Sequence, residues 1–279
     1  MKNILKEIVL FTIILLLFIY SLTNNTLITE KIIYSTNIWL TKIVPTLFPT
    51  FIIVDLISNS KIPYYISKYL HINYIYILSI ISGSPSNAYL LSNYNNQDLT
   101  KLLATTKYTS FIFTYNYLLL IFNKKISIIL IILNILSTII LIKLIKPSKI
   151  NFKVSNNKIN LPNSITKSIN ILISILGSII FFNILPISSI DNIYIKSFLL
   201  SITEITTSLT NLSITSLPIY IKLLLTIISI STCGFCIETQ IKSIISDTSI
   251  NYNKYLLYRL IHLLLYISLS IIAFLVIKI

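Results

Sequence analysis

The chain has 279 residues, of which 55% are hydrophobic and 11% are charged, and its mean hydropathy is +0.86. This composition lies outside the range of soluble domains of this length and predicts an integral membrane protein. The formal net charge of +14 fits lysines that flank membrane spans and meet anionic lipid head groups, so we expect a lipid bilayer as partner and no nucleic acid.

The candidate spans are apolar stretches that approach the about 20 residues a helix needs to cross roughly 30 Å of hydrocarbon. The first, residues 8–22, follows Lys2 and Lys6 and precedes no small-residue cleavage site, so it predicts an anchor helix rather than a removed signal peptide. The others are residues 38–57, 74–93, 102–122, 126–142, 168–185, 193–212, 217–245 and 256–277. Together they predict an all-α polytopic membrane protein with about 7–9 membrane helices.

A basic segment divides the chain into two halves. From Lys143 to Lys167 there are six lysines and no acidic residue, which predicts a cytoplasmic loop. Five complete crossings before this loop would leave it outside, so we expect the segment around Gly83 to be re-entrant. The predicted organisation is an anchor helix (1–30), a first transmembrane half (31–145), a basic loop (146–165) and a second transmembrane half (166–279).

Glycine is scarce, and its positions mark two polar breaks in apolar stretches. Two of the three glycines lie in such breaks, Gly83 within residues 79–87 and Gly234 within residues 229–240. Irregular backbone at bilayer depth is tolerated only where protein or a water-filled cavity satisfies it. Superposing Gly83 on Gly234 predicts two pseudo-repeated halves, which are inverted if the second break enters from the opposite membrane face, as in many secondary transporters. The alternative is two unrelated helices that each contain a glycine.

A broken helix presents unpaired N–H groups and the positive end of its dipole, which suits a carboxylate. We therefore predict a substrate site for a small organic anion at the two breaks. Its predicted residues there are Gly83, Ser84, Ser86, Asn87, Gly234 and Gln240. The alternative is that the Ser and Asn side chains only hydrogen-bond neighbouring helices.

Charged residues inside apolar stretches are costly and are treated as functional candidates. Glu204 is the predicted site of a coupling proton or cation; the alternative is an ion pair with Lys107, Lys196 or Arg259. Arg259 is the only arginine in the chain. Its planar guanidinium predicts a clamp on the substrate carboxylate or a partner for Glu204, and snorkelling to the lipid head groups is the alternative.

The remaining chemistry-bearing residues give weaker signals. Cys233 and Cys236 form a C-x-x-C pair, which leaves a membrane thiol oxidoreductase as an alternative function. The chain has no second cysteine pair, and His71 and His262 are too few for a metal site, so we expect no metal and no cofactor. Asp55, near the end of a span, is expected at the membrane interface. Motifs of soluble enzymes are absent, so we predict no enzyme activity.

Four sequence blocks carry a resemblance to a known family: Trp39-Leu-Thr-Lys-Ile-Val-Pro-Thr-Leu-Phe-Pro-Thr-Phe51, Ser82-Gly-Ser-Pro-Ser-Asn-Ala-Tyr-Leu-Leu91, Cys233-Gly-Phe-Cys-Ile-Glu-Thr-Gln240 and Tyr255-Leu-Leu-Tyr-Arg259. In order and spacing they resemble the sporulation integral membrane protein YlbJ family, one of the nucleoside-recognition or gate-domain membrane proteins. The chain departs from the family pattern at Ser84, where tyrosine is usual, and at Asn87, where a second glycine is usual. Cys233 and Phe235 also replace the residues that usually flank Gly234.

The resemblance implies membrane passage of a small molecule, which in spore formers is the aromatic dicarboxylate dipicolinate. It also implies a bacterial cell membrane, the forespore or mother-cell membrane if the organism forms spores. We therefore predict a multi-pass transporter or facilitator of a small organic anion. The other alternative is a membrane assembly or sporulation factor without transport, and a homo-oligomer is left open.

Overall fold

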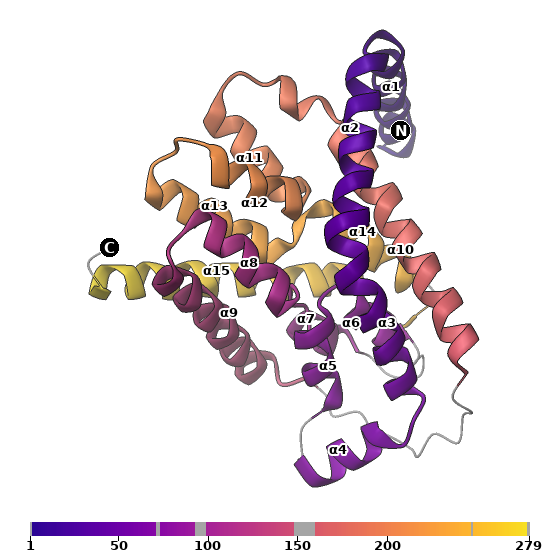
Figure 1. Ribbon diagram of the computed structural model, residues 1–279, viewed down its shortest axis with the longest axis vertical. Coiled ribbons are helices and arrows are strands. Elements are labelled where there is room, and N and C mark those ends of the chain that lie inside the picture. The colour runs from indigo at the N-terminus through magenta and orange to yellow at the C-terminus, as the bar shows by residue number, and fades with distance from the viewer. Residues whose placement is uncertain (1, 71–72, 93–98, 148–159, 247, 278–279) are drawn as a thin grey trace.

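The computed structural model describes residues 2–70, 73–92, 99–147, 160–246 and 248–277 (Figure 1). Within these ranges the regular structure is helical and no strand occurs, which confirms the all-α prediction. Five helices are long and apolar enough to cross a membrane: Asn25–Ser58, Lys124–Ile145, Leu161–Ser189, Ile219–Ile244 and Tyr252–Val276. His71 and most of the predicted basic loop lie outside the described residues.

The first half begins with helix α1 (Lys2–Thr23) and then a long, nearly continuous helix. The long helix consists of α2 (Asn25–Ile38), a π-helical stretch η1 (Trp39–Ile43) and α3 (Val44–Ser58). The wide π turn ends two residues before Pro45, which has no N–H to donate to the preceding turn. The following elements are α4 (Ile62–Leu70), α5 (Tyr74–Ser82), α6 (Ser86–Ser92), α7 (Thr100–Thr105), α8 (Phe111–Ile121) and α9 (Lys124–Ile145).

The second half runs from the long helix α10 to the C-terminal helix. Its elements are α10 (Leu161–Ile184), the 3₁₀ turn η2 (Pro186–Ser189), α11 (Ile193–Thr203), α12 (Ile205–Ile214), α13 (Ile219–Thr232), α14 (Gly234–Ile244) and α15 (Tyr252–Ile277). Four of the predicted spans are thus interrupted. The interruptions at Gly83 and Gly234 confirm the predicted breaks, whereas those between α7 and α8 and at Glu204 were not predicted.

Apart from α1 and α4 in the first half, both halves have the same order of elements: a long helix, two interrupted helices and a second long helix. In the first half these are α2–α3, α5–α6, α7–α8 and α9, and in the second they are α10, α11–α12, α13–α14 and α15. This order matches the break at Gly83 with the one at Glu204, and not with Gly234 as the superposition of the glycines predicted. The halves interlock, because α10 packs on α2 and α3, α15 packs on α9, α12 packs on α8, and α14 packs on α6.

The segment α11–α12, expected as one span, turns back on itself at Glu204. Asn211 Nδ2 donates a hydrogen bond to Ser197 Oγ at 2.8 Å. In a straight helix these two residues would lie about 21 Å apart along the axis. The α11–α12 segment is therefore a helical hairpin with Glu204 at its tip.

Apolar side chains cover both the core and the outer surface. Trp39 on η1 donates from Nε1 to the carbonyl oxygen of Leu172 at 2.9 Å, which joins the first long helix to α10. Large apolar residues are also exposed, among them Ile214 at 80% and Val276 at 76%. An exposed apolar surface of this extent is expected of helices that face lipid.

Candidate functional site

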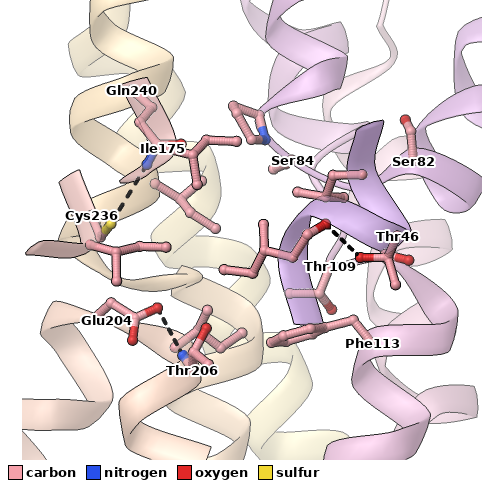
Figure 2. A pocket seen from close by; sticks show the side chains of 17 residues that line it. Thr46, Ser82, Ser84, Thr109, Phe113, Ile175, Glu204, Thr206, Cys236 and Gln240 are labelled. Atoms are coloured by element: carbon pink, nitrogen blue, oxygen red, sulfur yellow. Dashed lines mark hydrogen bonds between the residues drawn. The ribbon is translucent and has the colours of Figure 1, made fainter. Parts of the chain in front are cut away.

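The four interruptions surround one cavity of about 70 Å³, enough for several water molecules (Figure 2). Its walls come from both halves of the chain. The polar lining residues are Thr46 on α3, Ser82 and Ser84 at the α5–α6 turn, Thr109 and Ser110 before α8, Glu204 and Thr206 at the α11–α12 turn, and Gln240 on α14. The cavity therefore lies where the irregular backbone of the two halves meets.

Gly83 and Gly234 set how closely the interruptions approach one another. Both have positive φ values, +74° and +77°. A Cβ on Gly83 would lie 2.6 Å from the backbone nitrogen of Ser110, and a Cβ on Gly234 would lie 2.7 Å from the carbonyl oxygen of Thr203. The two predicted site residues thus bring backbone segments together, and neither lines the cavity.

The serines and the asparagine after Gly83 divide into one lining residue and two supporting ones. Ser84 lines the cavity, its N–H donates to the carbonyl of Tyr108 at 2.7 Å, and its hydroxyl donates to Asn87 Oδ1 at 2.9 Å. Ser86 donates to the carbonyl of Gly83 at 2.5 Å, and Asn87 is fully buried. Ser86 therefore bonds within the turn, Asn87 Nδ2 lies 3.5 Å from Thr106 Oγ1 after α7, and neither residue lines the cavity.

Glu204 lines the cavity and caps helix α12. Its carboxylate accepts hydrogen bonds from the N–H groups of Thr206 (2.9 Å) and Thr207 (2.7 Å) and from the Thr207 hydroxyl (2.8 Å). Only 3% of Glu204 is exposed. The ion pairs of the described residues are Lys107–Glu238 and Lys167–Asp55, so none of the predicted cationic partners reaches Glu204. Its charge is stabilised instead by the N-terminal end of α12.

A buried ion pair between Lys107 and Glu238 joins the α7–α8 break to α14. The Lys107 ammonium also donates to the carbonyl of Thr232, at the end of α13. The hydroxyls of Tyr255 and Tyr252 donate to the Glu238 carboxylate at 3.2 and 3.4 Å. Both charges are visible in the sequence, but their pairing depends on the break between α7 and α8, which no glycine or proline marks.

Arg259 binds two helix ends rather than the cavity. Its Nη1 donates to the carbonyl of Ala104 at 3.0 Å and its Nη2 to the carbonyl of Ser231 at 2.6 Å. These carbonyls lie in the last turns of α7 and α13, where a cation is favourable. Arg259 is 6% exposed and does not line the cavity, so its guanidinium neither clamps a ligand there nor snorkels to head groups.

Gln240 and Cys236 form the α14 wall of the cavity. Gln240 Nε2 lies 3.6 Å from Cys236 Sγ, and the buried Gln240 Oε1 has no hydrogen-bond partner. A buried acceptor without a partner in a cavity is suited to a ligand or a water molecule. Cys233 and Cys236 are both buried free thiols.

Two other buried polar residues, Asp55 and His262, lie outside the cavity. Asp55, expected at the interface, is 3% exposed, accepts from Ser164 Oγ at 2.6 Å and from Tyr89 at 3.1 Å, and pairs with Lys167 at 3.7 Å. His262 is fully buried and bonded to serine and threonine hydroxyls. Across the part of the chain that is described, no three His, Cys, Asp or Glu side chains form a metal-binding group.

No family model, curated protein or solved structure matches this chain.

Proposed function

We propose that this multi-pass membrane protein is a transporter or facilitator that moves a small organic anion through the cavity between the helix interruptions. The observation that carries the proposal is that interrupted helices from both halves line a single cavity. Interrupted helices at the interface of two repeats form the binding sites of many secondary transporters. Alternating exposure of this cavity to the two membrane faces is the proposed mechanism.

The start of α8 supports an anion as the ligand. Ser110 is the N-cap residue of α8 and lines the cavity, and its side chain makes no capping hydrogen bond. The N–H groups in the first turn of α8, at the positive end of the helix dipole, therefore remain available to bind an anion. Ser84 adds a hydroxyl and Gln240 an amide within the same cavity.

The negative charge of an ionised Glu204 opposes the binding of an anion in this cavity. Glu204 is the one side chain among the lining residues that carries a carboxylate or an amine. An anion about 4 Å from an ionised carboxylate is repelled by about 4 kcal/mol at an effective dielectric constant near 20. Binding of an anion therefore requires a proton or a cation on Glu204, which makes Glu204 the proposed coupling residue.

The first test is dipicolinate release from liposomes that contain the purified chain, followed by terbium luminescence. Gln240→Leu removes the amide from the cavity wall, and Thr239→Val is the matched control because Thr239 is exposed on the same helix. We expect at least a tenfold loss of flux, about 1.4 kcal/mol of transition-state stabilisation, in Gln240→Leu alone. Full flux in this variant would contradict the placement of the site.

Glu204→Gln tests coupling, because the amide oxygen still accepts from the α12 N–H groups while the charge is lost. We expect flux in this variant to lose its response to an imposed proton or sodium gradient. A folded parent protein without dipicolinate flux would overturn the assignment and favour the assembly role.

A further inference from the structure

A second cavity, of about 190 Å³, lies between α2, α11 and the end of α10, and two lysines line it. Lys31 Nζ donates to the carbonyl of Leu185 at 3.1 Å, and Lys196 Nζ donates to the carbonyl of Ser188 at 3.0 Å. These carbonyls hold both ammonium groups at the same cavity. Each ammonium has three N–H donors, so donors remain for a ligand.

No carboxylate lines this cavity, although the Glu204 carboxylate lies behind Thr207, which does line it. Neither lysine belongs to an ion pair of the described residues. The nearest acids in sequence, Glu30 and Asp191, are exposed and do not line the cavity. Two ammonium groups at one cavity, that of Lys31 partly buried and that of Lys196 exposed, attract an oxyanion, and most strongly one with two negative charges.

The first turn of α12 separates the two cavities. Thr207 lines the lysine cavity, whereas Glu204 and Thr206 line the cavity between the interruptions. The N–H and hydroxyl of Thr207 also hold the Glu204 carboxylate. A shift of this single turn would therefore change the barrier between the cavities and the hydrogen bonds of Glu204 together.

We propose that Lys31 and Lys196 form a second anion site, a vestibule that binds a small dicarboxylate before it enters the cavity at Glu204. This inference rests on the proposed function. The chemistry that is recognised is a doubly charged oxyanion group. A free dicarboxylate and a lipid phosphate both carry oxyanions, and the experiment separates these two sources.

Binding is tested first, without transport. The purified full chain is acetylated at lysine with and without dipicolinate, with neutral pyridine as control, and each site is quantified by mass spectrometry. We expect dipicolinate to slow acetylation of Lys31 and Lys196 at least fivefold and to leave the similarly half-buried Lys222 unchanged. No protection, or protection by phosphatidylglycerol nanodiscs and not by dipicolinate, would overturn the proposal.

Flux is measured next, in the same liposomes as above. Lys31→Gln and Lys196→Gln are each expected to raise the half-saturating dipicolinate concentration about tenfold, with a smaller rise in Lys31→Arg and none in Lys222→Gln. Unchanged half-saturation in both glutamine variants would contradict the vestibule. If the parent chain shows protection but no flux, the proposed function fails and the second anion site stands.

Discussion

At the scale of single residues, the closest backbone approaches depend on two glycines. The segment before Gly83 ends α5 and the segment after Gly234 begins α14, and each glycine faces the backbone of the neighbouring interruption. A side chain at either position meets backbone atoms, which cannot rotate away as the end of a flexible side chain can. These contacts therefore limit the geometry of the cavity that lies beside them.

We expect Gly83→Ala and Gly234→Ala to destabilise the protein by about 2–4 kcal/mol, because each combines a positive φ with a steric clash. For a chain of this size the melting temperature in detergent should fall by roughly 5–15 °C. Gly177→Ala is the control, since a Cβ there meets nothing within 4 Å. Equal melting temperatures for all three variants would show that the close approaches do not exist.

The buried pair Lys107–Glu238 gives a prediction that a surface pair would not. Lys107→Met or Glu238→Gln alone should cost about 3–5 kcal/mol, because the remaining charge loses its partner in a buried place. The double variant should be more stable than either single variant, although the Thr232 carbonyl then loses a donor. Additive losses in a double-mutant cycle of thermal unfolding would contradict the pairing.

At the scale of elements, the capping of α12 by Glu204 holds the hairpin tip in place. Glu204→Ala removes the acceptor for two N–H groups, and we expect a loss of about 1–2 kcal/mol of stability. Glu204→Gln should lose less, because its amide oxygen still accepts. Thermal unfolding of the two variants measures the difference, and equal losses would show that the charge, and not the cap, is what stabilises α12.

The predicted and the unpredicted helix breaks differ in the residues that form them. Helices α9, α10 and α15 follow from long apolar stretches, and the break at Gly83 from a glycine within a polar segment. The α7–α8 break contains only Thr, Lys, Tyr and Ser. The α11–α12 break is formed by Glu204, which also caps α12. Neither break contains a glycine or proline that would mark it in the sequence. The glycines mark unlike members of the two halves, so superposing them shifts the repeat by one interrupted helix.

At the scale of the whole molecule, the hairpin α11–α12 determines the sidedness of the second half. Because α11–α12 turns back, the chain before α11 and the chain after α12 should lie on one membrane face. The exposed residues Asp191 and Ser216 mark these positions. Lys143, at the end of α9, should lie on the opposite face, since α10 crosses between.

Single cysteines introduced at Asp191, Ser216 and Lys143 test this arrangement with a membrane-impermeant thiol reagent in oriented vesicles. We expect Asp191→Cys and Ser216→Cys to be labelled from the same side and Lys143→Cys from the other. The two native cysteines are buried, so the parent chain should show little background labelling. Labelling of Asp191→Cys and Ser216→Cys from opposite sides would mean that α11–α12 crosses the membrane.

The contact of Trp39 with Leu172 gives the molecule a built-in optical probe. Trp39 is the only tryptophan of the chain, and its indole donates to a carbonyl of α10. Ile43, one turn further along the first long helix, and Ile175, one turn further along α10, both line the cavity at the interruptions. Any opening that separates these two helices breaks the indole hydrogen bond, so the emission spectrum of the unlabelled protein will report the motion in real time.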